Sequence, residues 1–115
     1  MTRSSTLVPD QPVAGTVHMV LDDLGLLGRM WRELDEEQTD ERDIVRAIFD
    51  SQFARPVKVV AFNIEGGWAR DVTEDIARAV IELARFENAK LSRSTAAFVE
   101  CATGEEVPDD VSETN

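Results

Sequence analysis

Residues 57–64 constrain the fold more than any other part of the chain. They form an apolar run that only Lys58 and Asn63 interrupt, which is typical of a strand buried on both faces. A Gly-Gly pair at 66–67 follows and predicts a turn, and a pattern with helical spacing begins near Val72. The sequence therefore predicts a central strand that a glycine turn joins directly to a helix.

The helix after this turn has a well-marked start. Asp71 is a favourable N-cap residue, and Glu74 stands at the third helical position, as in a capping box. The residues that follow give the helix a broad apolar face, which consists of Ile76, Ala77, Val80, Ile81, Leu83 and Ala84.

Upstream, residues 16–34 predict a β-hairpin. Apolar residues alternate with their neighbours over 16–24, glycines bracket the connection at 25–28, and residues 29–34 alternate again. A helix over 26–37 is the alternative, because the apolar residues of that stretch also fit helical spacing.

Two further helices complete the predicted elements. Residues 40–52 carry an apolar stripe with helical spacing, Thr39 is a candidate N-cap, and the Arg55-Pro56 pair ends the helix. Residues 92–102 predict a short last helix.

Together these elements predict an α+β fold with the order β-β-α-β-α. If the third strand lies beside the first, the sheet is three-stranded, its order is 2-1-3 and all neighbouring strands are antiparallel. Both main helices then cover one face of the sheet, which gives a two-layer α/β sandwich.

The 115 residues fit a single domain, which we place at residues 16–102. Residues 1–15 mix Ser, Thr, Pro and Gly with scattered apolar residues and predict a flexible N-terminal arm. Residues 103–115 contain five acids and no base, which predicts an acidic disordered tail.

Charge and cysteine content argue against several classes of function. A net charge of −11 repels nucleic-acid phosphate and anionic lipid, so we expect no direct nucleic-acid or membrane partner. Cys101 is the only cysteine and cannot form an internal disulfide, which favours a reducing cytoplasm. We expect no membrane span and no secretory signal, because no apolar run approaches about 20 residues and residues 1–15 lack an apolar core segment.

The turn after the central strand is the candidate ligand-binding site, with Glu65, Trp68, Arg70 and Asp71 as its residues. They offer two carboxylates for acid–base chemistry, a cation for an anionic substrate, and an aromatic wall. Acids crowd the helix start and no G-x-G-x-x-G pattern is present, which disfavours nucleotide binding. The favoured interpretation is structural, with Trp68 packed at the sheet edge and Arg70 paired with nearby acids.

Few other residues indicate chemistry. His18 is the only histidine, and no serine lies in a G-x-S-x-G pattern. One His and one Cys are too few for a zinc site, and the acidic runs at 22–23 and 33–37 lack the spacing of a calcium loop. We therefore expect no catalytic residue, no metal and no cofactor, and we interpret both acidic runs as solvated surface.

A two-layer fold leaves one sheet face uncovered, and we expect Val20, Trp31, Val60 and Phe62 to lie there. An exposed cluster that contains aromatic residues is typical of an interaction surface. The expected partner is a second copy of the chain, giving a homodimer, or another protein. The two leucines at 26–27 are expected to fold back onto the core, the alternative being a hydrophobic contact for a partner.

The chain also resembles a family of small hypothetical proteins found in bacterial genomes. The resemblance covers about residues 17–80 and rests on Val20-Leu21-Asp22-Asp23-Leu24-Gly25, Val59-Val60-Ala61-Phe62-Asn63, Gly67-Trp68, Arg70-Asp71-Val72 and Glu74-Asp75-Ile76-Ala77. It implies a bacterial protein, but it gives no information on activity and assigns no catalytic residues.

Three functions follow as hypotheses. The favoured one is a regulator or adaptor that acts through protein–protein contacts. The second is a small-ligand binder or enzyme that uses the turn, which a pocket beside Trp68 with Glu65 and Arg70 pointing inward would support. The third is an acidic mimic of nucleic acid that binds a basic protein.

Overall fold

The computed structural model describes residues 16–33 and 40–113. Within these ranges four strands form one antiparallel sheet in the order β2-β1-β3-β4, and three helices accompany it. The elements are β1 (Thr16–Asp23), β2 (Arg29–Arg32), α1 (Glu41–Phe49), β3 (Pro56–Asn63), β4 (Trp68–Asp71), α2 (Thr73–Phe86) and α3 (Arg93–Thr103), with 3-10 turns at Gly25–Leu27 and Asp109–Val111.

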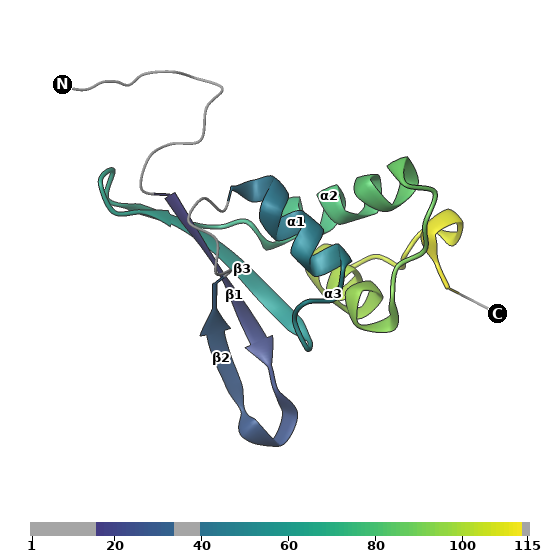
Figure 1. Cartoon of the computed structure of the whole chain (residues 1–115), viewed down its shortest axis with the longest axis horizontal. Helices are drawn as coiled ribbons and strands as arrows, with labels where there is room; N and C mark the ends of the chain where they lie inside the picture. Colours follow the sequence, from purple (N-terminus) through teal and green to yellow (C-terminus); the bar gives the residue numbers. More distant parts are fainter. Residues whose placement is uncertain (1–15, 34–39, 114–115) are drawn as a thin grey trace.

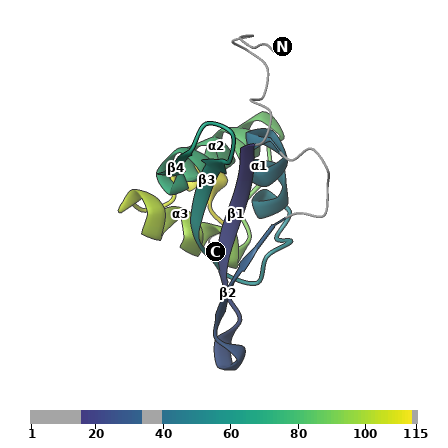
Figure 2. The same ribbon diagram turned by 90° about the vertical axis from the view of Figure 1, so that its left-hand side faces the viewer.

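The helices pack on one face of the sheet, so the fold has two layers (Figure 1). After a quarter turn of the molecule, β1 and β3 lie in front and the helices lie behind them (Figure 2). Val20 of β1 pairs with Val59 of β3, and both are completely buried in one cluster with Ile44 of α1 and Ile76 of α2. The core therefore lies between the two long central strands and the helices. In the described ranges no helix is long and apolar enough to cross a bilayer.

The predicted hairpin is confirmed, and the alternative helix is wrong for residues 29–32, which form β2. The turn explains the outcome, because Gly25 and Gly28 have positive φ angles of 71° and 86°, which glycine adopts without strain. The Leu24 N–H donates to the Gly28 carbonyl at 2.8 Å and closes the hairpin. Residues 34–37 of the alternative helix lie outside the described residues, as does Thr39.

The predicted sheet is wrong in its number of strands, because Trp68–Asp71 adds a fourth strand beside β3. The glycine turn therefore joins two strands before the chain enters α2. The Gly67 N–H donates to the Asn63 carbonyl at 2.9 Å, with Gly67 at a φ of 70°. Residues 68–71 do not show a strand period, because two apolar residues are followed by two charged ones.

Two predicted helix caps also differ from the structure. Val72, not Asp71, is the N-cap of α2, and Asp71 instead accepts a hydrogen bond from the Thr73 N–H at 2.9 Å. Helix α1 begins one residue after Asp40, whose carboxylate accepts from the Asp43 N–H in a reciprocal capping box. The last helix is confirmed, with Ser92 as its N-cap.

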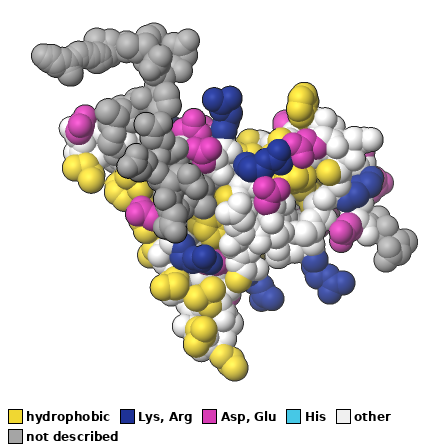
Figure 3. Space-filling view, viewed as in Figure 1, with side chains coloured by type: hydrophobic (Ala, Val, Ile, Leu, Met, Phe, Trp, Pro, Cys, Tyr) yellow, Lys and Arg dark blue, Asp and Glu magenta, His cyan; other side chains and the backbone are white. Residues whose placement is uncertain are grey.

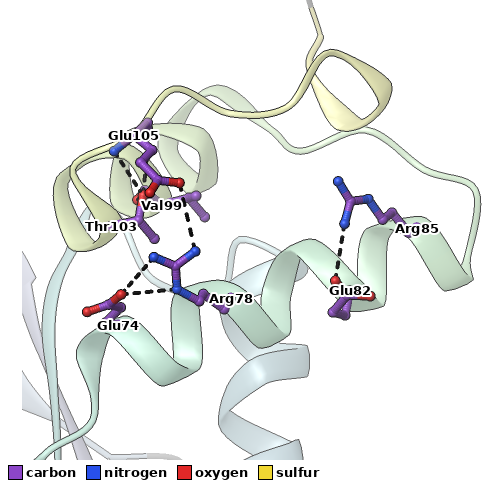
Figure 4. A network of polar contacts seen from close by, with 7 residues as sticks. All are labelled: Glu74, Arg78, Glu82, Arg85, Val99, Thr103 and Glu105. Carbon is purple, nitrogen blue, oxygen red and sulfur yellow. Dashed lines mark hydrogen bonds and ion pairs between the residues drawn. The ribbon is translucent and has the colours of Figure 1, made fainter.

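The C-terminal segment is ordered, so the prediction of a disordered tail does not hold for residues 104–113. Val107 and Val111 are 8% and 1% exposed, and the Leu91 N–H donates to the Val111 carbonyl at 2.9 Å. The acids of this segment meet arginines of α2, with Arg85 Nε 2.8 Å from an Asp110 oxygen. Figure 4 shows Arg78 between Glu74 of its own helix and Glu105 of the segment.

Replacing Val111 with alanine tests whether this segment belongs to the folded unit. The change removes apolar volume from a site with 1% exposure, so we expect the free energy of unfolding to fall by about 2 kcal/mol. Urea unfolding measures this value, with Asp109→Ala, an exposed position of the same turn, as the control. An unchanged unfolding midpoint for Val111→Ala would contradict the packing.

Candidate functional site

The structure separates the residues of the predicted turn site. Along β4, Trp68 and Arg70 lie opposite Asn63 and Ala61, on the face that the helices cover, whereas Asp71 lies on the other face. The Arg70 guanidinium carbon is 5.8 Å from the centre of the Trp68 ring, a cation–π contact. The turn thus brings Trp68 and Arg70 together, and it does not bring Asp71 to them. Glu65 is exposed in the turn itself.

The carboxylate of Asp71 already has partners within its own connection. It accepts from the N–H and the hydroxyl of Thr73, and Lys58 Nζ is 3.9 Å away. The Thr73 hydroxyl and N–H, assisted by Lys58, hold the pKa of Asp71 below its ordinary value. A carboxylate of lowered pKa is a weaker general base. The bonds of Asp71 therefore do not support its expected role in an acid–base pair with Glu65.

Two hollows can be described on the helical side of the molecule, and neither includes a residue of the turn. The first has a volume of about 560 Å³ and lies between α1 and α2, where it is lined by Asp40, Glu41, Arg42, Asp43, Val45, Arg46, Ala79 and Leu83. Asp40 and Asp43 cap α1, and Arg46 binds Glu87, so these groups already have partners. The second, of about 190 Å³, lies between α2 and the C-terminal segment. Among the described residues no group of three or more His, Cys, Asp or Glu could hold a metal ion.

The sheet face opposite the helices carries a continuous apolar surface. Leu21 lies opposite Trp31, Met19 opposite Val60, and Val17 opposite Phe62. Ala69 of β4 lies beside Phe62 on the same face, and the members of this set on β1 and β3 alternate with buried side chains. We call this set the open face: Val17, Met19, Leu21, Trp31, Val60, Phe62 and Ala69.

Val20 does not belong to the open face, so its prediction as an interface residue is wrong. It lies opposite Val59 and Arg32 and is completely buried under the helices. Because side chains alternate along a strand, the burial of Val20 directs its neighbours Met19 and Leu21 to the open face. Trp31, Val60 and Phe62 do lie on the open face, and whether a partner binds them stays a prediction.

The hairpin formed by β1 and β2 extends beyond the helical layer (Figure 1). Its end carries exposed apolar side chains. Leu26 and Leu27 are 106% and 85% exposed, and Met30 is 50% exposed. We call these three residues the hairpin tip. Figure 3 shows hydrophobic side chains gathered at this end of the molecule. The expectation that the two leucines fold back onto the core is therefore wrong, because the hairpin carries them away from it.

Asp22 holds the base of this hairpin, although the sequence indicated a solvated acid. Its side chain is completely buried and accepts from the Arg55 N–H at 2.7 Å, the Ala54 N–H at 3.0 Å and Arg32 Nη1 at 2.7 Å. Burial works to raise the pKa of Asp22, yet the bonds from Arg55, Ala54 and Arg32 together hold it below its ordinary value. The strand period places Asp22 on the same face as Val20, and because the sequence alone does not show which face the helices cover, it does not reveal that Asp22 is buried.

Comparison with protein-family models, with curated proteins and with solved structures gave no match.

Proposed function

We propose that this protein acts in the cytoplasm by binding another protein, as a regulator or adaptor, through the hairpin tip and the open face. The observation that carries the proposal is the exposure of large apolar side chains on the hairpin, with Leu26, Leu27 and Met30 at least half exposed and Trp31 45% exposed. Such a cluster beside an apolar sheet face that none of the described helices covers is typical of a protein-binding surface.

The base of the hairpin supports this proposal, because it limits the conformational entropy that binding must remove. Three hydrogen bonds converge on Asp22, and Arg32 lies with its guanidinium carbon 5.4 Å from the centre of the Phe53 ring. The hairpin is thereby fixed to the core at Asp22, and its exposed apolar side chains extend from Met30, opposite Asp22, to Leu26 and Leu27 in the turn.

The turn at residues 65–71 gives less support to a ligand-binding or enzymatic function. Its carboxylates do not face each other across a hollow, and the cation lies against the tryptophan. Mimicry of nucleic acid also receives less support, because arginines neutralise several of the described acids. These pairs are Arg46 with Glu87, Arg78 with Glu74, and Arg85 with Glu82 and Asp110.

A double substitution at the hairpin tip tests the proposal. We expect the tagged variant Leu26→Ser/Leu27→Ser to retain at least tenfold less of the proteins that the wild-type chain captures from its native cells, because the substitutions remove the two most exposed apolar side chains of the hairpin tip. Quantitative mass spectrometry of the captured proteins measures this ratio. The fold is expected to persist, because both side chains are exposed.

Phe86→Ser is the matched control, since Phe86 is also an exposed large apolar residue, at 87%, but ends helix α2. It should leave capture unchanged. Equal capture by the tip variant and the wild type would refute the proposed role of the hairpin.

A further inference from the structure

We infer that the open face binds a second copy of this chain, sheet against sheet, in a two-fold symmetric dimer. The inference rests on the proposed function and names the partner of one of the two surfaces, while the hairpin tip is left to a different protein. Two observations support it, the register of the apolar side chains and the charges that border them, while the area that they offer limits the stability of the dimer.

The register makes the open face one unbroken apolar layer. Three cross-strand pairs join β2 to β1 and β1 to β3, namely Leu21–Trp31, Met19–Val60 and Val17–Phe62. Ala69 continues the layer onto β4 beside Phe62. Two aromatic side chains, Trp31 and Phe62, thus lie at opposite ends of the layer. Aromatic side chains bury large apolar areas when an interface forms.

The charges around this layer favour a copy of the chain over a basic or an acidic partner. The register places Asp23, Arg29, Lys58 and Asp71 on the same face. They form two ion pairs, Arg29–Asp23 at 3.8 Å and Lys58–Asp71 at 3.9 Å, so two acids balance two bases. On a chain of net charge −11, this face is therefore locally neutral. Each ion pair presents one positive and one negative charge to the identical face of a second copy. A strongly charged partner would gain little electrostatic attraction from this face.

The area sets the strength of the dimer. Two strands of eight residues and two of four give a footprint of about 400 Å² per copy, from a rise of about 3.3 Å per residue and a strand spacing of about 4.8 Å. The total of about 800 Å² is below the roughly 1,200 Å² of a stable interface. We therefore expect a weak, reversible dimer that forms only at high protein concentration.

Sedimentation velocity from about 10 µM to about 1 mM tests the dimer. The wild-type chain should shift from monomer to dimer across this range, and Ala69→Arg should raise the dissociation constant at least tenfold by placing a charge in the apolar layer. Ala69 is exposed on an edge strand, so the variant is expected to fold. Phe62→Lys provides a second disruption, with circular dichroism as the check on its fold.

The outcomes separate this inference from the proposed function. Leu26→Ser/Leu27→Ser should dimerise like the wild type even where it loses its protein partner. A wild-type chain that stays monomeric at about 1 mM overturns the dimer. A dimer that Ala69→Arg leaves intact overturns the assignment of the dimer interface to the open face. If Ala69→Arg instead abolishes capture of another protein, the open face binds that protein and not a second copy, which also overturns the inference. None of these results depends on whether the hairpin tip binds its partner.

Discussion

Replacing Asp22 with alanine is expected to lower the free energy of unfolding by about 3–5 kcal/mol, the range for removing one partner of a buried charged network. The substitution leaves the N–H groups of Ala54 and Arg55 and the guanidinium of Arg32 without their acceptor at the base of the hairpin. Urea unfolding at neutral pH measures the loss. Asp23→Ala is the matched control, because Asp23 is the next residue of β1 but is partly exposed on the other sheet face.

The carboxylate of Asp22 also makes the free energy of unfolding depend on pH. The pKa of Asp22 lies below its ordinary value of 3.8 in the folded protein. Its stabilisation is therefore fully present above that ordinary value and is lost as the pH falls through the lowered folded pKa. Asp22→Asn should be less stable than the wild type at pH 7, and the difference should shrink in the acid range. A constant difference between neutral and strongly acidic pH would refute this role of the charge.

Replacing Phe98 with alanine is expected to cost about 3–5 kcal/mol as well, because the change leaves a large cavity in the core. Phe98 of α3 is 2% exposed and belongs to the main buried cluster. Phe86 of α2 is the same residue type at 87% exposure, so Phe86→Ala should change stability by no more than about 0.5 kcal/mol. Thermal and urea unfolding of both variants measure the contrast. Similar losses for the two would mean that α3 is not part of the core.

The predictable parts of the fold are those whose apolar spacing extends over many residues. Strand β3 and helix α2 were identified because their apolar residues recur over eight and fourteen residues, respectively. Strand β4 was missed because Trp68–Asp71 is short and exposed throughout, so nothing in its pattern distinguishes it from a turn. The acidic composition of the C-terminal segment predicts disorder, because only two apolar residues, Val107 and Val111, stand among its charged residues. In the structure both valines are buried and hold the segment against the core.

The residues of the open face and the hairpin tip could also be predicted only in part. Trp31, Val60 and Phe62 were placed on the uncovered face because alternation along strands is a local property. The assignment of Val20 failed because choosing which set of alternating residues faces the helices needs the register between strands. The exposure of Leu26 and Leu27 could not be predicted, because an apolar residue is assigned to the core by default. The two leucines are exposed because the hairpin carries them away from the core.

Site-specific photo-crosslinking in native cells tests most directly whether the hairpin tip contacts another protein. A benzophenone amino acid replaces Leu27 of the hairpin in one variant and Phe86 at the end of α2 in another, two exposed apolar positions on different elements. We expect a discrete crosslinked product with another protein from position 27 and none from position 86. The absence of any product from position 27, or the same product from both positions, would contradict it.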